Sequence, residues 1–533
     1  MTPMPKSRSR CRERGVSLLL AGLSLTFIVP AVGLMVDVSV LYSVKARFQA
    51  AVDGASLAAA RALSLGQTTQ AQATAAQNNA VNWFYANFPT GSWGTTGTNM
   101  SQSTVSVFDD ANNAHVRNVT VTASTNVPSF FMSWFGANST PLTATGNASR
   151  RDVVVMMVLD RSGSMAGAPC TSMLTAAKLF TGQFAAGRDQ IGLVSFSDNV
   201  YIHSSPTTNF QTVLGYTNNL GTGSGAIDTI VCNGGTSTAQ AISVAYNELY
   251  KVNQPGALNV LMFETDGLPN TLTLNFWDSA TNTTGLKSTS ACTDKNGKKL
   301  SQGGFASAAV LPSWTTGQTM SAGSYFANIP AGMIGGIYSD DPGSSGQFNV
   351  MYKYWSTSTA NNFGSSTFVA STAATGCAFG GGKTYTPPPT DINWFPLKDV
   401  WGNQLSPGYL PVTLSSGKVT SGSWQSFHNA ALNATDSAAY QARTNTTLPA
   451  YFFVIGLGGT SANPPDYVLM QRIANDPNGD NYNSPALYSS CSQEANCTTY
   501  PGQPQGNFIY SSSPASLSQA FLSISSEVLR LSK

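Results

Sequence analysis

The chain of 533 residues contains little charge and very little histidine. Charged residues make up 10% of the sequence, whereas an ordinary soluble domain carries about 25%. The formal net charge of +2 is close to neutral, so we expect no broad basic surface for nucleic acid. Three histidines, His115, His203 and His428, are too few for a histidine-rich zinc site or a multi-histidine catalytic centre.

Motifs typical of several enzyme classes are also missing. The sequence has no P-loop, no glycine-rich nucleotide motif, no plausible Ser–His–Asp set and no Cys-x-x-Cys pair of a zinc ribbon. Its length exceeds that of one compact domain, which predicts two or three units. Hydrophobic residues make up 42%, enough to exclude disorder throughout. The abundant Ser, Thr, Asn and Gly favour an exported protein.

The amino terminus predicts a membrane anchor. Five basic residues between Lys6 and Arg14 precede an uncharged apolar run, Val16 to Val36, whose length as a helix is about 30 Å, the thickness of a bilayer core. The positive-inside rule then leaves residues 1–14 in the cytoplasm, residues 15–36 in the membrane and the bulk of the chain outside. The alternative is a cleaved signal peptide, whose apolar region would be about 7–15 residues.

Beyond the run, the pattern predicts one long helix that continues to about Leu63. Apolar residues recur at spacings of three and four, namely Leu41, Val44, Phe48, Ala51, Ala55, Ala58 and Ala59. Such an alanine-rich seam suits close packing on another helix. An ordinary amphipathic helix that packs on its own domain is the alternative.

The same segment resembles the TadE/TadG-like segment of the bacterial Tad (tight adherence, Flp-type) pilus-assembly proteins. The resemblance is carried, in this order, by Arg14-Gly15, the apolar run with Pro30, Val36-Asp37-Val38, Tyr42 and the stretch Phe48 to Ala60. It implies a single-pass protein of the bacterial inner membrane with a cytoplasmic amino terminus. The bulk would be periplasmic or exposed at the cell surface, among other pilus-assembly or envelope proteins.

Residues 37–150 are expected to hold this helix and a small α+β spacer. From about residue 65 the sequence is polar and irregular, with half-buried strands predicted at Thr104–Phe108 and Val116–Ala123. The aromatic residues Phe130, Phe131, Trp134 and Phe135 are interpreted as a small core, with a partner surface as the alternative. No chemistry is visible in this part.

A different pattern begins after Asp152. The apolar run Val153–Leu159 is typical of a strand buried on both faces of a parallel sheet. A tight polar loop follows, and then a helix-like segment, Ser172–Phe184, so the loop belongs at the carboxyl edge of the sheet, where open α/β folds bind ligands. The loop offers oxygen donors at positions i, i+2 and i+4, which suit a hard divalent cation such as Mg²⁺, on Asp160, Ser162 and Ser164.

Two more loops complete the pattern. Gly234–Thr238 precedes the helical stretch Ala239–Tyr250, and the apolar strand from Val260 ends in Asp266-Gly267. In this order the five side chains resemble the metal-ion-dependent adhesion site of von Willebrand factor A domains: Asp160, Ser162, Ser164, Thr236 and Asp266. The resemblance implies Mg²⁺, or Mn²⁺ or Ca²⁺, held by these residues, and a partner's carboxylate at the open position. Thr238 is the alternative to Thr236.

The predicted fold is therefore α/β, a doubly wound, mostly parallel, Rossmann-like sheet of the von Willebrand A type, over residues 151–533. Gln190–Phe196 supplies a further strand, and residues 270–422 form a long β-rich insertion that either builds the binding surface or is a decorative subdomain. The remaining elements are helices at Ser423–Arg443, Asp466–Ala474 and Ser516–Leu531, and strands at Ala450–Leu457 and Asn507–Tyr510.

Six cysteines lie beyond the apolar run, which fits an oxidising compartment. Fifteen pairings are possible. Cys170 follows the first loop and Cys232 precedes the second, so both belong near one sheet edge. The preferred scheme joins Cys170 to Cys232, Cys292 to Cys377, and Cys491 to Cys497, and leaves Cys11 free.

These patterns support a non-enzymatic, envelope-anchored protein that binds a protein ligand through a metal ion, as an adhesion component of a Tad/Flp-type pilus assembly system. A structural scaffold whose metal site only rigidifies the domain is the second interpretation. A metal-dependent hydrolase that uses Asp160 or Asp266 is the third.

Overall fold

The structure is a computed structural model, and it divides the chain into two compact units, Met1–Arg150 and Arg151–Ser532, with Lys533 assigned to the first. Each unit is described by itself. The residues described are 11–66, 68–197, 200–215, 225–277, 333–342, 348–354, 367–369, 399, 401–405, 414–415, 418–419, 424–458, 466–484 and 502–532.

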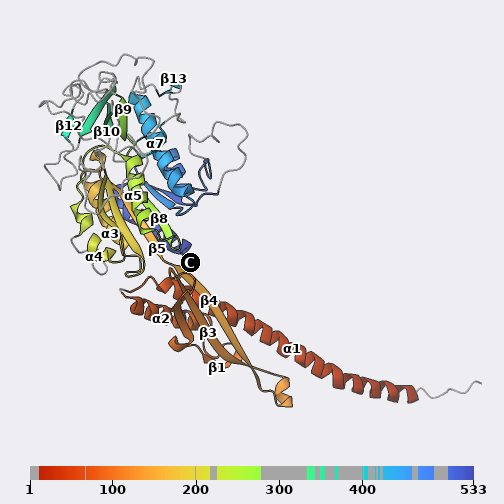
Figure 1. Ribbon diagram of the computed structural model, residues 1–533. Helices are drawn as coiled ribbons and strands as arrows, with labels where there is room; N and C mark the ends of the chain where they lie inside the picture. Colours follow the sequence, from red (N-terminus) through yellow and green to blue (C-terminus); the bar gives the residue numbers. More distant parts are fainter. Residues whose placement is uncertain are drawn as a thin grey trace, which may run out of the picture. The chain divides into compact units, whose positions relative to one another are not determined.

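The first unit begins with one long helix, α1 (Cys11–Ala62), which passes through Pro30 without ending and confirms the predicted extension toward Leu63. Its amino-terminal half extends beyond the rest of the unit (Figure 1). This half is long and apolar enough to cross a membrane, and only 6% of its most apolar stretch is buried. Proline is tolerated inside such helices.

The second half of α1 packs on helix α2 (Thr69–Asn87), which sequence analysis missed. That stretch was interpreted as irregular because it is polar and has few large apolar residues. Its buried residues nevertheless follow a helical spacing of four, Gln72, Ala76, Ala80 and Phe84. Alanine is the best helix former, and its small side chain lets the two helices approach closely. The alanine-rich seam of α1 thus packs on another helix, and that helix belongs to the same unit, so both interpretations of the seam hold.

A four-stranded antiparallel sheet completes the first unit. Burial alternates along β3 and β4, as expected for strands with one covered face. The core between sheet and helices includes Phe48, Phe84 and Val121. The strands are β1 (Thr96–Asn99), β2 (Val105–Asp109), β3 (Val116–Pro128) and β4 (Ser139–Arg151).

The aromatic cluster in the β3–β4 loop is not a core, and the sequence interpretation was wrong on this point. The exposed fractions are 56% for Phe130, 39% for Phe131, 87% for Trp134 and 72% for Phe135. A short 3₁₀ turn, η3 (Met132–Phe135), holds these side chains at the end of the hairpin. We call these four residues the aromatic tip.

The second unit is built on a six-stranded sheet with the order β16-β15-β8-β5-β6-β7. Neighbouring strands are parallel except for the edge pair β6 and β7. The central strands are buried on both faces, which explains their continuous apolar runs. The strands are β5 (Val153–Asp160), β6 (Gln190–Phe196), β7 (Val200–Thr207), β8 (Leu258–Thr265), β15 (Tyr451–Leu457) and β16 (Asn507–Ser511).

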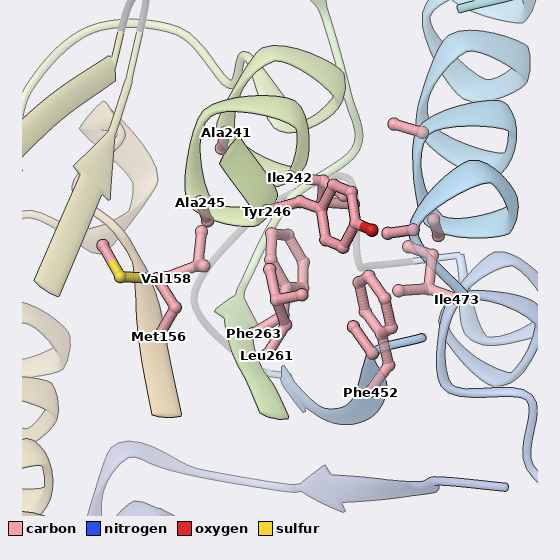
Figure 2. Packing of buried hydrophobic residues seen from close by; sticks show 14 of the residues in the cluster. Met156, Val158, Ala241, Ile242, Ala245, Tyr246, Leu261, Phe263, Phe452 and Ile473 are labelled. Carbon is pink, nitrogen blue, oxygen red and sulfur yellow. The ribbon is translucent and has the colours of Figure 1, made fainter. Parts of the chain in front are cut away.

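Helices cover both faces of this sheet, so the predicted doubly wound α/β fold is confirmed. One face packs on α5, α7 and α8, and the other on α3 and α10. Figure 2 shows Tyr246 of α5 over Phe263 of β8 and Phe452 of β15. The helices are α3 (Ala168–Thr181), α4 (Phe210–Leu214), α5 (Thr238–Val252), α7 (Trp424–Thr444), α8 (Tyr467–Ala474) and α10 (Leu517–Leu531).

The described parts of residues 270–422 are largely strands. Four of them form an antiparallel sheet with the order β12-β11-β10-β9, and two form a hairpin. They are β9 (Thr271–Trp277), β10 (Met333–Pro342), β11 (Phe348–Tyr354), β12 (Thr367–Val369), β13 (Leu414–Ser415) and β14 (Lys418–Val419). Most of the remaining expected insertion lies outside the described residues.

Candidate metal centre

The first loop of the site starts where β5 ends. Asp160, the last residue of this strand, is fully buried. One oxygen of its carboxylate accepts a hydrogen bond from the backbone N–H of Ser162 at 2.7 Å, and the other accepts one from the hydroxyl of Thr265. These bonds fix the carboxylate at the carboxyl edge of the sheet, beside the end of β8.

Backbone hydrogen bonds join the first loop to the second. The N–H of Gly163 donates to the carbonyl of Gly234 at 2.8 Å, and the N–H of Asn233 donates to the carbonyl of Arg161 at 2.6 Å. A Cβ at position 163 would lie 3.3 Å from the Gly234 oxygen, so glycine suits this approach. The two loops therefore form one structure although about 70 residues separate them.

Three side chains meet directly in the site. The hydroxyls of Ser162 and Ser164 are 2.9 Å apart, and the Ser164 hydroxyl donates to Oδ1 of Asp266 at 2.6 Å. The Ser162 hydroxyl lies 3.5 Å from the same oxygen, at the limit of hydrogen bonding. Asp266 is fully buried and follows β8 directly. The ends of β5 and β8 thus place a carboxylate from each strand among the serine hydroxyls.

Thr236 reaches the same place from the second loop. Its backbone is held on both sides by Asn270, since the Thr236 N–H donates to the Asn270 side chain at 2.7 Å and the Thr236 carbonyl accepts the Asn270 N–H at 3.0 Å. A Cβ built on Gly267 would lie 3.6 Å from the Thr236 hydroxyl and 3.8 Å from the Ser164 hydroxyl. The two hydroxyls therefore flank Gly267.

Thr238, the alternative to Thr236, is the first residue of α5. Its side chain is fully buried, and within the described part of the chain its hydroxyl makes no hydrogen bond. The structure brings the five predicted residues Asp160, Ser162, Ser164, Thr236 and Asp266 to one edge of the sheet and places Thr238 at the adjoining helix terminus.

The charged forms of the carboxyl groups in this site are destabilised by burial and by repulsion between them. Burial, followed by repulsion from Asp266, raises the pKa of Asp160 to about 7, although hydrogen bonds from Thr265 and Ser162 oppose the shift. Burial also raises the pKa of Glu264, the residue before Thr265, well above its ordinary value, with further contributions from Asp160 and Asp266. A divalent cation would offset this repulsion and hold the carboxyl groups in their charged form.

The chemistry of the donors fits such a cation. Carboxylate and hydroxyl oxygens are ligands for Mg²⁺, Mn²⁺ and Ca²⁺ rather than for softer metals. Among the residues that the structure describes, no group of three or more His, Cys, Asp and Glu side chains is arranged to hold a metal ion. A metal at this edge would therefore depend on the hydroxyls of Ser162, Ser164 and Thr236 as well as on the two aspartates.

Three supporting residues received no role from the sequence. Thr265 orients Asp160, Asn270 holds the Thr236 loop, and Glu264 adds a third carboxyl group. Glu264 and Thr265 end the apolar run that begins at Val260, immediately before Asp266. Buried polar residues at a strand end are a signal that could have identified both.

A disulfide bond stabilises the surroundings of the site. The structure contains the bond between Cys170 and Cys232 that the preferred scheme proposed. Cys170 lies in the first turn of α3, and Cys232 lies shortly before Gly234. The other four candidates, Cys292, Cys377, Cys491 and Cys497, lie outside the described residues.

Two family models match segments of this chain, one in each unit. Residues 15–62 match the model of a family described as Flp pilus-assembly TadE/G-like, and residues 155–268 match the model of the von Willebrand factor type A domain. Neither description names an enzyme. The predicted combination of a TadE/G-like segment with a von Willebrand factor A domain is thereby confirmed.

No curated protein matches the chain. Among solved structures, it is similar to the PilB minor pilin from Streptococcus sanguinis, with 11% identity, a TM-score of 0.31, and coverage of 83% of this chain and 80% of that chain. It is also similar to the vWF domain of the type V pili tip protein Mfa5 from Porphyromonas gingivalis. The identity is 14%, the TM-score is 0.32, and the alignment covers 72% of this chain and 98% of that chain.

A third similar structure is the pilus adhesin SpaC from Lactobacillus rhamnosus GG. Its identity is 12%, its TM-score is 0.33, and the alignment covers 80% of this chain and 35% of that chain. TM-scores and identities this low say nothing about what this chain binds.

Proposed function

We propose that this chain, which joins a TadE/G-like segment to a von Willebrand factor type A domain, is a membrane-anchored component of a Tad/Flp-type pilus assembly system that binds a protein ligand through a divalent cation. The observation that carries the proposal is the meeting of Asp160, Ser162, Ser164, Thr236 and Asp266 at one sheet edge.

The residues of the site would contribute to binding such an ion in different ways. Asp160 and Asp266 provide negative charge, and the hydroxyls of Ser162, Ser164 and Thr236 provide neutral oxygen donors. Thr265 keeps the Asp160 carboxylate oriented. The bound ion would supply a positive, electrophilic centre at this sheet edge. An Asp or Glu side chain of a partner would be attracted to that centre.

The anchor supports a role in the cell envelope. The exposed apolar half of α1 lies within the TadE/G-like match, residues 15–62, and the basic residues before it favour a cytoplasmic amino terminus. The von Willebrand factor A domain then lies outside the inner membrane, in the periplasm or at the cell surface. Two cysteines joined near the site fit this oxidising location.

A metal titration tests the site itself. We expect residues 151–533 to bind one Mg²⁺ or Mn²⁺ ion and to lose that binding on Asp160→Asn, a substitution that keeps the size of the side chain. Asp480→Asn removes an exposed aspartate from the turn after α8 and serves as the matched control. Identical calorimetric isotherms for Asp160→Asn and the control would contradict the assignment.

A capture experiment separates adhesion from the scaffold interpretation. The full chain, solubilised from membranes, is expected to retain envelope proteins in Mg²⁺ and to release them with chelator, whereas Asp160→Asn retains none under either condition. If the wild type binds metal but captures the same proteins with and without chelator, the site only rigidifies the domain.

A further inference from the structure

The aromatic tip, Phe130, Phe131, Trp134 and Phe135, is held in place by the long helix. The carboxylate of Asp37, on α1, accepts three backbone hydrogen bonds from the loop, at 2.8 Å from Phe130, 3.0 Å from Phe131 and 2.9 Å from Met132. Three N–H donors on one carboxylate fix the loop firmly, because hydrogen bonds to a charged acceptor are the stronger kind. The exposed rings are therefore held by a defined support rather than by a loose loop.

The tip also contacts the helix one turn before Asp37. A Cβ built on Gly33 would lie 2.6 to 2.9 Å from three side-chain atoms of Phe131, closer than real atoms approach. Glycine at this position is what allows the Phe131 ring to lie directly on the helix backbone. Gly33 and Asp37 are separated by about 6 Å along the axis, so the tip is attached at one defined level of α1.

That level is the end of the apolar run. The run contains no charge from Val16 to Val36, and Asp37 is the first charged residue after it. Leu34, Met35 and Val36, between the two tip-contacting residues Gly33 and Asp37, are all exposed. The aromatic rings thus extend the apolar surface of the helix sideways at the point where a bilayer's hydrocarbon core would end.

Charge is absent from the part of the hairpin that lies next to the tip, and the nearest charged residues of the two strands are Arg117 and Arg150 at their far ends. No Asp, Glu, Lys, Arg or His occurs from Asn118 to Ser149, a stretch that includes most of β3 and β4. The Asp37 carboxylate at the tip has its charge compensated by the three loop N–H groups. A hairpin end without charged residues that carries Trp and Phe suits the membrane–water interface, where aromatic rings are enriched.

We propose that the aromatic tip is a second membrane contact of this protein, inserted into the interface of the leaflet at the carboxyl end of the span. The inference rests on the proposed anchoring of α1. Asp37 and Gly33 are its positioning residues. With two contacts at one level, the first unit is held in a fixed orientation to the bilayer instead of pivoting on a single helix.

The test uses the full chain labelled with fluorotryptophan, in bilayers of phosphatidylethanolamine and phosphatidylglycerol. Fluorine NMR resolves Trp134, assigned by Trp134→Phe. Trp83, assigned by Trp83→Phe, is the control, because it is half-exposed and packs on Gly54 of α1, about 25 Å further along the helix from Asp37. A nitroxide lipid labelled near the headgroup probes the interface, and a soluble gadolinium chelate probes water.

We expect the nitroxide lipid to broaden the Trp134 resonance several-fold more than the Trp83 resonance, and the chelate to give the reverse order. Broadening of Trp134 by the chelate alone would overturn the inference and indicate a tip that faces water or a protein partner. Extraction at alkaline pH, done on the same sample, separates the two proposals. If the protein resists extraction while Trp134 stays in water, only the tip assignment fails; if it is extracted, the anchor fails as well.

Discussion

The disulfide between Cys170 and Cys232 should contribute strongly to the stability of the second unit. It joins the first turn of α3, next to the Asp160 loop, to the segment that leads into the Thr236 loop. The half-cystine at position 170 is buried in the hydrophobic cluster beneath that helix. Replacing both cysteines by alanine removes the cross-link and places no polar atom in the core.

The expected loss follows from the length of the loop that the bond closes. A sequence separation of 62 residues corresponds to about 4 kcal/mol at 25 °C in the chain-entropy account of cross-links. We expect the free energy of unfolding of residues 151–533 to fall by roughly that amount in Cys170→Ala/Cys232→Ala. Natural domains are stable by about 5–15 kcal/mol, so the change is a large fraction of the total.

Urea unfolding measures the difference, and reduction of the double variant provides the control. Cys292, Cys377, Cys491 and Cys497 remain in that variant, so a further loss on reduction belongs to them and not to the bond under test. Adding Mg²⁺ at about a hundredfold excess over its Kd should stabilise wild type and variant alike, by about 2.7 kcal/mol if the site stays intact. A loss of stability below about 1 kcal/mol would refute the entropic reasoning.

Three other expectations follow from contacts elsewhere in the two units. Arg472→Leu leaves the carboxylate of Asp436, its buried partner at 3.0 Å, without its guanidinium, and should cost about 3–5 kcal/mol in urea unfolding; if adding Asp436→Leu restored nothing, the pairing argument would fail. Burial, and then the charge of Arg161, lowers the pKa of His203 from 6.5 to about 3. As pH falls, the unfolded chain therefore takes up a proton at this histidine before the folded chain does. The free energy of unfolding should decrease between about pH 6.5 and pH 3, by up to about 1.4 kcal/mol per pH unit. His203→Gln should flatten that part of the pH–stability curve, and an unchanged slope would count against a neutral imidazole in the folded protein. Asp37→Asn should speed hydrogen exchange of the amides of Phe130, Phe131 and Met132 by roughly tenfold, since about 1.4 kcal/mol corresponds to a factor of ten; equal exchange rates would show that the loop does not depend on the Asp37 charge.

Local sequence patterns identified most of the sheet strands and long helices of the second unit, but they missed the edge strand β7 and the short helix α4. Continuous apolar runs identified the buried strands, and polar residues at their ends identified Asp160 and Asp266. This worked because parallel strands buried on both faces must be apolar along their whole length, while their carboxyl ends all lie at one edge. The pairing of Cys170 with Cys232 followed from the same edge argument.

The supporting contacts of the site required the tertiary structure. Thr265 reaches Asp160 because β8 lies directly beside β5, with Leu159 opposite Glu264. No local pattern specifies which strands are neighbours, since that order depends on contacts between residues about 100 positions apart in the chain. The role of Asn270 in holding Thr236 has the same origin.

Two features of the first unit could not be predicted from local sequence patterns. Helix α2 was missed because its alanine and glutamine face becomes a core only against α1. The aromatic tip was assigned to a core because aromatic residues usually bury, yet its position is decided by Asp37, which lies 93 residues from Phe130 in the chain. The sequence alone determined that four aromatic residues lie close together in a stretch without charge; only the tertiary structure decided that their rings face outward, because a carboxylate on α1 holds the loop at the end of the apolar run.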